Sequence, residues 1–361
     1  MHESISRYEA SKAVVEERDT PGSKSPGGSG LSRRSLLKSA GRLAVGLPST
    51  WLLGCEPRHR DVNRWGSSTL GSSGYVIMEA FVQAVNRRGR TRNSSFATAG
   101  AAENLALIAN GSLEFGHSTS VDWTVAASGT TPYHSPIVCQ QLFAYATWHM
   151  PPVVRRDSRI EALADLRGRR YAPSTPGSAA ALMHHALMKA AGLYDQIRWT
   201  YGSWTEIYDA FTSKRVDVVP GVITNDAISP RLIEAEAVVD VMPLEIPAEV
   251  MKKAQEINAG IFAATKGPEA WSAIEAPIVF PYSIGILAAA RDTTAEMGYE
   301  ITKAIYDDAE RIRSLGVALR YVDPEFALRG LMAAFPVNAG ALSYFHENGI
   351  RNDALAIVAD P

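Results

Sequence analysis

The amino-acid sequence predicts an α/β protein whose sheets are flanked by helices on both faces. From about residue 62 onward, short apolar segments that read as strands alternate with segments of helical periodicity. This alternation is typical of a parallel or mixed sheet. The rhythm occurs before and again after the proline pair 151–152, which indicates two α/β lobes. The length of 361 residues is enough for two domains of ordinary size.

The composition is that of a globular protein, with 46% hydrophobic and 20% charged residues and a formal net charge of −2. We expect no nucleic-acid partner, because nucleic-acid binders usually carry a basic face. No apolar run reaches the roughly 18 residues that a permanent transmembrane helix needs. Of the two cysteines, Cys139 lies in the apolar run IVCQQLFAYA and is predicted to be a buried core thiol.

Residues 1–55 have the features of a targeting segment and are not expected to be part of the fold. Residues 1–30 are polar and predicted to be disordered. Arg33 and Arg34 then open a pattern similar to a twin-arginine export signal, and Leu52-Leu53-Gly54-Cys55 resembles a lipobox in which Cys55 would be lipidated. This order of motifs predicts a lipid-anchored protein of the periplasm or cell envelope. A basic amphipathic helix in a cytosolic protein is the alternative.

The first lobe is predicted over residues 61–152 and 280–361. A strand should lead into Trp65, and a Gly/Ser loop then enters a helix with Val76, Phe81, Val82 and Val85 on its apolar side. A strand within 90–100, a helix over 101–109 and a strand within 113–120 follow. Three strand ends carry hydroxyls, at 67–69, 98 and 118–120, where open α/β sheets bind ligands. Ordinary turn chemistry is the alternative.

The Gly/Ser loop has the chemistry of an anion cradle. The first N–H groups of a helix lack intrahelical partners, and the helix dipole favours negative charge beside them. Small residues would let a carboxylate or phosphate approach these donors. A plain capped turn is the alternative, and a second loop of the same kind at 173–178 favours the binding interpretation.

The second lobe is predicted over residues 153–279. The prolines at 151–152 mark a crossing point, and DSRIEALADLRGRR reads as a short helix that leads to a strand. The loop 173–178 opens a helix over 179–191 that Gly192 closes. A helix from Trp204 and an apolar strand follow. Residues 277–290 read as a strand that crosses back, before helices within 298–315, 324–335 and 339–350 complete the first lobe.

The collinear order of these signals resembles the TAXI family of solute-binding proteins, the extracytoplasmic receptors of one class of tripartite (TRAP) transporters. Residues 68–75 are similar to its Gly-Ser-Thr-Gly-Gly-Thr-Tyr-Tyr loop, Ala102–Leu105 to its Val-Glu-Asn-Leu, and Ser120 to the serine of its Gln-Ser-Asp turn. Val153–Arg155 with Asp165–Arg169 fits its Val-Val-Arg…Asp-Leu-Lys-Gly-Lys pattern, Pro176–Ser178 its Pro-Gly-Ser loop, and Ile301–Ala304 a late helix. The similarity runs from about residue 62 to residue 350.

The resemblance implies a two-lobe periplasmic-binding-protein-like fold (type II), in which each lobe is a mixed sheet flanked by helices that closes over an organic acid. It also implies TRAP membrane subunits as partners, and we expect a monomer without a cofactor. The ligand-binding residues expected on this basis are Ser68, Thr69, Ser72, Tyr75, Ser120, Trp148, Pro176, Gly177, Ser178 and Trp204. Glu103 and Asn104 are expected to stabilise a helix start.

Departures from the family pattern predict a less polar pocket. Leu70 and Gly74 replace a threonine and a tyrosine, Thr119 and Val121 replace Gln and Asp, Ala179–Ala181 replace Gly-Thr-Glu, and Trp148 stands where Glu is common. A few placed polar groups set ligand selectivity. We therefore expect a ligand with one anionic group and a larger apolar body than that of glutamate.

An enzyme and a metal site are not expected. The sequence has no Gly-x-Ser-x-Gly elbow, no phosphate-loop lysine motif, no His-Glu-x-x-His and no Cys-x-x-Cys. His117 beside Ser118 is the only candidate pair of base and nucleophile in the sequence. Because neighbours in a strand point to opposite faces, this pair is not expected to act together. His184 and His185 have no second pair of candidate ligands at metal-binding spacing. A periplasmic sensor that serves a signalling system instead of a transporter is the alternative function.

Overall fold

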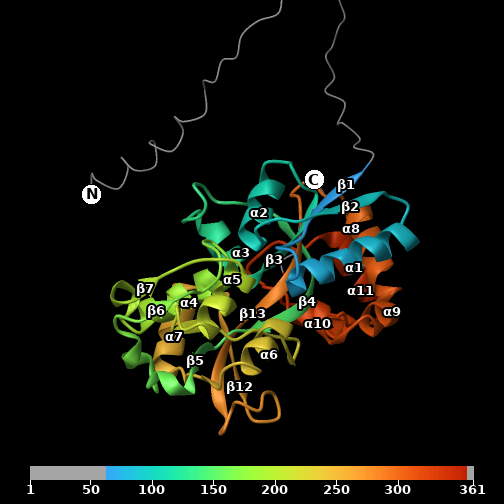
Figure 1. The fold of residues 1–361 in the computed structure, drawn as a ribbon. Coiled ribbons are helices and arrows are strands. Elements are labelled where there is room, and N and C mark those ends of the chain that lie inside the picture. Colours follow the sequence, from blue (N-terminus) through green and yellow to red (C-terminus); the bar gives the residue numbers. More distant parts are fainter. Residues whose placement is uncertain (1–61, 356–361) are drawn as a thin grey trace, which may run out of the picture. The chain divides into compact units, whose positions relative to one another are not determined.

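The computed structural model describes residues 62–355, so the predicted export signal at Arg33-Arg34 and the predicted lipidation site at Cys55 lie outside the described residues. The described chain has an α/β fold with two mixed sheets flanked by helices, which confirms the predicted fold class (Figure 1).

The first sheet has the order β2-β1-β3-β13-β4-β9-β10, with β12 beside β13. Neighbours among β1, β2 and β3 are parallel, and β13 runs antiparallel to both β3 and β4. Its strands are β1 (Asn63–Gly66), β2 (Asn93–Phe96), β3 (Phe115–Thr119), β4 (Gln140–His149), β9 (Ile223–Thr224), β10 (Ala227–Ile228), β12 (Phe262–Lys266) and β13 (Ile278–Ala289).

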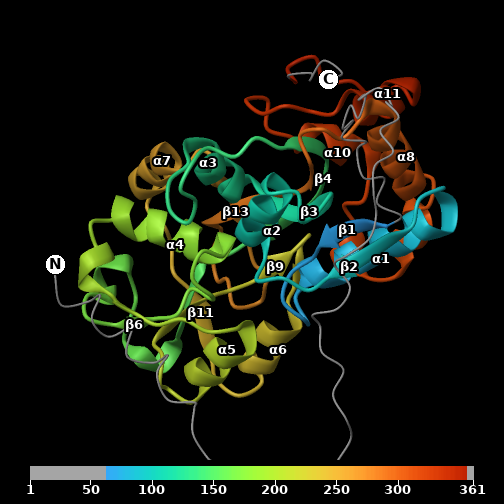
Figure 2. The same cartoon turned by 90° about the horizontal axis from the view of Figure 1, so that it is seen from above.

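Helices cover this sheet. Helices α1, α8 and α11, far apart in the sequence, lie side by side, while α2 packs on β3 and α3 (Figures 1 and 2). These helices and their neighbours are α1 (Ser73–Arg88), α2 (Ala101–Ala109), α3 (Ser120–Ser128), α8 (Ala295–Tyr306), α9 (Ala309–Ser314), α10 (Pro324–Arg329) and α11 (Ala339–Glu347).

The second sheet has the order β11-β5-β8-β6-β7 and is also mixed. Its strands are β5 (Pro152–Arg155), β6 (Arg170–Tyr171), β7 (Arg198–Trp199), β8 (Val218–Pro220) and β11 (Val241–Pro243). The helices of this part of the chain are α4 (Ala179–Ala190), α5 (Trp204–Thr212), α6 (Pro230–Glu236) and α7 (Ala248–Ile257).

The chain passes from the first sheet to the second at Pro151, between β4 and β5, and returns to the first sheet through β9 and later through β12 and β13. Pro152 is the first residue of β5, a strand position that proline tolerates. The strands β9, β10 and β12 therefore belong to the first sheet by hydrogen bonding, although they lie inside residues 153–279.

The buried face of α1 differs from the predicted one at a single position. Phe81, Val82 and Val85 are buried as predicted, but Val76 is 49% exposed. Ile77 and Met78 face the core in its place, because a helix repeats every 3.6 residues and Val76 falls outside the buried sector. Cys139 is buried, as predicted.

The predicted helix DSRIEALADLRGRR is wrong. Two 3₁₀ turns, Arg156–Ser158 and Leu163–Leu166, replace it. The chain leaves helical geometry at Arg159 and at Gly168, which adopt φ values of 58° and 70°. Left-handed positions of this kind end helices.

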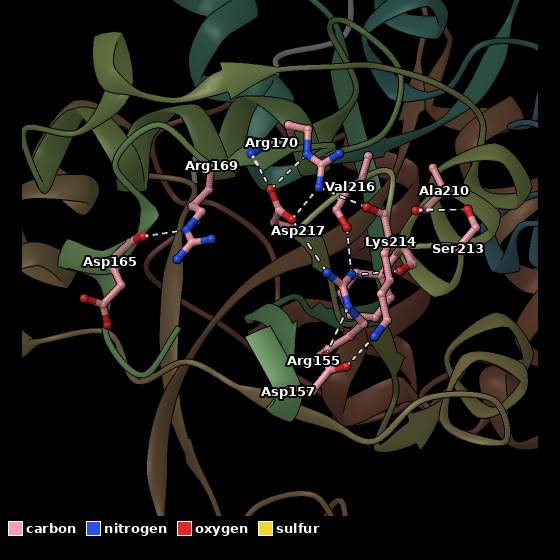
Figure 3. Close-up of polar contacts among 11 residues, drawn as sticks. Arg155, Asp157, Asp165, Arg169, Arg170, Ala210, Ser213, Lys214, Val216 and Asp217 are labelled. Atoms are coloured by element: carbon pink, nitrogen blue, oxygen red, sulfur yellow. Dashed lines mark hydrogen bonds and ion pairs between the residues drawn. The ribbon is translucent and has the colours of Figure 1, made fainter. Parts of the chain in front are cut away.

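A buried arginine, Arg155, connects β5 of the second sheet to α5 (Figure 3). Arg155 is 5% exposed, and its Nη1 donates to the carbonyl oxygens of Phe211 and Val216 at 2.8 and 2.7 Å. The carboxylates of Asp157 and Asp217 each lie 3.6 Å from its guanidinium. These bonds and ion pairs join β5 to α5 and to the segment that leads into β8.

Candidate functional site

A cavity of about 590 Å³ lies between elements of the two sheets. One wall comes from the β1–α1 loop, the start of α2, and the ends of β3 and β4. The facing wall comes from the β6–α4 loop and the starts of α5 and α6. The β9–β10 hairpin, which pairs with β4 in the first sheet, and residues 316–318 complete the lining.

Four helices begin at this cavity with a serine. The N-caps are Ser72 of α1, Ser178 of α4, Ser203 of α5 and Ser229 of α6, and each side-chain oxygen accepts the N–H three residues later at 3.2 to 3.3 Å. Serine is favoured here because its hydroxyl satisfies an otherwise unpaired N–H. In Ser72 and Ser178 the oxygen acts as an acceptor, so the hydroxyl hydrogen can be donated to a guest.

A fifth helix, α2, begins at the cavity without a side-chain cap. Gly100 precedes it with φ of 126°, a conformation suited to glycine. Glu103 accepts the N–H of Ala99 at 2.6 Å, and the buried Asn104 side chain donates to the carbonyls of Ser67 and His117 at 2.7 and 2.9 Å. Glu103 and Asn104 therefore organise the start of α2 and the ends of β1 and β3.

The buried side of the cavity is polar but uncharged. Burial lowers the pKa of His117 to about 4, so its ring is neutral at pH 7. Its Nδ1 lies 2.5 Å from the hydroxyl of Tyr145. The Ser283 hydroxyl is fully buried and has no hydrogen-bond partner among the described residues, although it lines the cavity. A buried hydroxyl without a partner is costly, and a guest could satisfy it.

Two tryptophans line opposite walls. Trp148 donates its indole N–H to the hydroxyl of Ser73 at 2.8 Å, and the Thr224 hydroxyl donates to the same oxygen at 3.2 Å. Gly285 leaves room for the Trp148 ring, since a Cβ at that position would lie 2.4 Å from the ring. Trp204 stands in the first turn of α5, facing the cavity from the other wall.

Charged side chains contribute little to this surface. Arg231 and Glu234 line the cavity, but they pair with each other at 2.7 Å. The helix starts are therefore its main source of positive potential. Each helix start carries the equivalent of about half a positive charge, and together they favour an anion.

The structure brings six of the predicted site residues to this cavity: Ser68, Thr69, Ser72, Trp148, Ser178 and Trp204. The cavity lining does not include Tyr75, Ser120, Pro176 or Gly177. Tyr75 is half-buried on α1. Ser120 is fully buried, where its hydroxyl donates to Gly260 O at 2.6 Å and accepts from Ile284 N at 3.1 Å, so it joins β13 to α3 instead.

Several wall residues were not predicted. Ser203 and Ser229 could have been found from their capping patterns, Ser-x-x-Glu at 203–206 and Ser-Pro at 229–230. The sequence singles out His117 only as a candidate enzyme base. Thr224 and Ser283 carry no local signal, because their positions depend on strand pairing between distant segments.

Within residues 62–355, no group of three or more His, Cys, Asp or Glu side chains is placed to hold a metal ion. The helices described there include none that is long and apolar enough to cross a membrane.

Comparison with known proteins places this architecture in a family. No curated protein matches the chain. Among solved structures, the alkanesulfonate-binding protein SsuA from Xanthomonas axonopodis pv. citri bound to MOPS has a TM-score of 0.43 at 16% identity, over 80% of this chain and 91% of that one. The periplasmic aliphatic sulphonate-binding protein SsuA from Escherichia coli has a TM-score of 0.42 at 17% identity, over 80% and 90%. A structure described as a periplasmic transporter has a TM-score of 0.48 at 13% identity, over 72% and 87%. Residues 66–349 match the sequence profile of the NMT1-like family, and the chain belongs to that family.

Proposed function

We propose that this protein is an extracytoplasmic solute-binding receptor that captures a small organic anion and delivers it to a TRAP-type membrane transporter. The observation that carries the proposal is the convergence of five helix starts, four of them capped by serine, on one cavity between the two sheets. This geometry offers N–H and O–H donors to an anion without a fixed cation.

The ligand class follows from the rest of the wall. Val76, Val222 and Val317, together with Ala179 and Ala180, add apolar surface beside the donors. Trp148 and Trp204 add aromatic faces, which contribute large apolar contact area. We infer a ligand with one carboxylate and an apolar body larger than that of glutamate.

Capture would proceed by closure of two lobes, 61–152 with 280–361 against 153–279, with the strands β9, β10 and β12 of the latter range staying with the first sheet. Because the cavity wall draws on both sheets, an anion would contact all its donors only in the closed form. Its differential affinity for the two forms would then set the population shift. Such binding involves no chemical step, so we propose a non-enzymatic role.

A matched panel tests the anion site. Calorimetry with phenylacetate, its neutral amide phenylacetamide, 4-methylpentanoate and glutamate separates the charge from the apolar body. We expect both monocarboxylates to bind at least about tenfold more tightly than phenylacetamide, equivalent to about 1.4 kcal/mol. Equal binding of phenylacetate and phenylacetamide would refute the anion site, and a preference for glutamate would refute the inferred apolar body.

Transporter coupling and anchoring are supported by the resemblance to the TAXI family and by the Arg33-Arg34 and Cys55 motifs. Genes for TRAP membrane subunits beside the gene of this protein would support uptake, whereas a neighbouring sensor kinase alone would favour signalling. Cell fractionation of Cys55→Ser should show release from the membrane fraction. A variant that stays in that fraction as the unchanged protein does would argue against the lipid anchor.

A further inference from the structure

A carboxyl group lies directly behind the cavity wall. Asp122 stands in the first turn of α3 and is fully buried. Its Oδ2 accepts a hydrogen bond from the Thr119 hydroxyl at 2.5 Å. Its Oδ1 has no hydrogen-bond partner among the described residues. Thr119 itself lines the cavity, so one side chain separates this carboxyl from a bound guest.

The surroundings of Asp122 make its ionisation costly. No Lys or Arg within residues 62–355 forms an ion pair with it. Burial raises the pKa of Asp122 to about 7, against the hydrogen bonds from Thr119 and the backbone, which lower it. The elements packed around Asp122 carry further titratable groups. They are His117 of β3, Tyr133 and Cys139 of the following loop, Tyr145 and His149 of β4, Glu103 of α2, His184, His185 and Lys189 of α4, and Tyr282 of β13. Burial lowers the pKa of His149 to about 4, so this ring is neutral at pH 7.

None of these groups supplies a compensating positive charge to Asp122. Burial keeps the pKa of His117 at about 4, of His184 at about 3 and of His185 at about 4, so all three rings are neutral at pH 7. Lys189 lies in the last turn of α4, over the ring of Tyr194.

The Thr119 hydroxyl has a single hydrogen, and the protonation state of Asp122 determines the direction of that hydrogen. While Asp122 is ionised, Thr119 donates its hydrogen to it and has only oxygen lone pairs left for a guest. Those lone pairs repel an anion. When Asp122 carries a proton, its own O–H can donate to Thr119, and the Thr119 hydrogen is free to turn towards the cavity.

We propose that Asp122 and Thr119 form a proton-linked switch, through which the cavity takes up an organic anion together with one proton on Asp122. The proton comes from solvent, and no bond other than O–H is made. An anion in the cavity also disfavours a second negative charge close by, which reinforces the uptake. This inference rests on the proposed anion-binding function and assigns Thr119 and Asp122 a role in setting its pH dependence.

The alternative role for Asp122 is structural, as the acidic residue that stabilises the start of α3. Asp122→Asn separates the two roles. An Asn side chain keeps an acceptor for the helix start, and its amide N–H can donate to Thr119 as the protonated acid would. It therefore mimics the proton-bound state at every pH.

The experiment measures phenylacetate affinity by calorimetry between pH about 6 and about 8.5, where phenylacetate stays ionised. For the unchanged protein we expect affinity to fall by up to about tenfold per pH unit above neutrality, with proton uptake shown by heats that depend on the ionisation enthalpy of the buffer. Asp122→Asn should bind with little pH dependence. Thr119→Val keeps the carboxyl but loses the hydroxyl, so its affinity should depend on pH less steeply than that of the unchanged protein. Asp292→Asn removes an exposed carboxyl and should behave like the unchanged protein.

A direct measurement accompanies the binding data. The carboxyl of Asp122, observed by infrared difference spectroscopy against Asp122→Asn, should lose its proton near neutral pH in the free protein and regain it when phenylacetate is added. Binding that is independent of pH and buffer, or an Asp122 that is ionised throughout this range, would overturn the switch. Absence of phenylacetate binding in both proteins at every pH would instead overturn the anion site, and the linkage with it.

Discussion

At the scale of single residues, the serine caps serve two purposes at once. Ser178 holds the first turn of α4 through Ala181 N and also lines the cavity. A cap residue that stabilises a helix and contacts a guest is hard to vary, because most replacements disturb both. Aspartate is an exception, since it caps helices as well as serine does but adds a negative charge.

Ser178→Asp should therefore separate the two purposes. We expect the free energy of unfolding in urea to change by less than about 1 kcal/mol, because the cap is retained. Phenylacetate binding should weaken by at least about tenfold, because the new carboxylate stands in the cavity. The matched control is Thr294→Asp at the N-cap of α8, which lies outside the cavity lining and should leave binding unchanged. Equal binding by both variants would remove Ser178 from the site.

Gly285 is a second residue whose size has consequences for the cavity. A Cβ there would lie 2.4 Å from the Trp148 ring and 3.1 Å from the Tyr145 ring, both of which are packed. Gly285→Ala should lower the free energy of unfolding by about 1–3 kcal/mol through overpacking. It should also weaken phenylacetate binding, because the Trp148 ring lines the cavity and must shift. Urea unfolding and calorimetry measure the two effects, and an unchanged affinity would show that Trp148 does not shape the ligand site.

At the scale of elements, the β9–β10 hairpin places one wall of the cavity. Its turn residues Asn225 and Asp226 are left-handed, with φ of 50° and 62°. The Asn225 side chain accepts from Thr147 N at 2.7 Å and donates to Ala318 O at 2.6 Å. Asp226 bonds to Lys266 at 2.6 Å and accepts from the Tyr321 hydroxyl at 2.5 Å. This two-residue turn thus ties β4, β12 and the segment after α9 together beside the cavity.

Replacements of Asn225 separate backbone strain from lost hydrogen bonds. Asn225→Ala should lower the free energy of unfolding by about 2–4 kcal/mol, since it loses both bonds and places alanine in a left-handed conformation. Asn225→Gly loses the bonds alone and should cost about 1 kcal/mol less than alanine does. Chemical denaturation measures both. If the glycine variant were as unstable as the alanine variant, the turn would carry no strain that favours Asn.

The elements also show what local sequence patterns determine. The helix predicted over 101–109 is α2, because glycine and turn residues bound a clear helical segment there. The starts of α1 and α4 follow from their serine caps. The sequence of β4 shows only an apolar run next to Cys139. All ten residues of this strand are buried, so it has no alternation that would predict a strand. The strands β9 and β10 have two residues each and depend on pairing with distant segments.

Local sequence patterns also determine only part of the candidate site. Loop chemistry identified Ser68, Thr69, Ser72 and Ser178, which sit before helices and carry a local signature. Ser120 has the right residue type in the right loop, but the approach of Gly260 and Ile284 occupies its hydroxyl. Only the folded chain determines whether a hydroxyl at a strand end meets a cavity or another backbone.

At the scale of the whole molecule, buried histidines determine how the protein responds to acid. Burial lowers the pKa of His117, His149 and His185 to about 4 and that of His184 to about 3, with neighbouring charge adding to the effect in the last three. In the unfolded chain these groups titrate near 6.5. Between pH about 6.5 and about 4, the unfolded state therefore binds more protons than the folded state, and stability is lost as the pH falls. Asp122 has the opposite effect on stability. Its pKa is raised to about 7, so between pH about 7 and about 4 the folded state holds a proton on Asp122 that the unfolded state has lost. This group therefore adds stability as the pH falls.

Four histidines outweigh one carboxyl, so we expect the free energy of unfolding to decrease from pH about 6.5 to about 4.5 by up to about 4 kcal/mol per pH unit, the slope for a net difference of about three protons. Urea unfolding at a series of pH values measures this slope. His117→Gln keeps a polar partner for Tyr145 but cannot titrate, so it should reduce the slope by about one proton, whereas Asp122→Asn should make it steeper. If the slope is the same in all three proteins, the buried rings and the buried carboxyl do not titrate differently in the folded and unfolded states. The polarity inferred for the cavity wall would then be wrong, because it depends on a neutral His117 and a protonatable Asp122 held behind that wall.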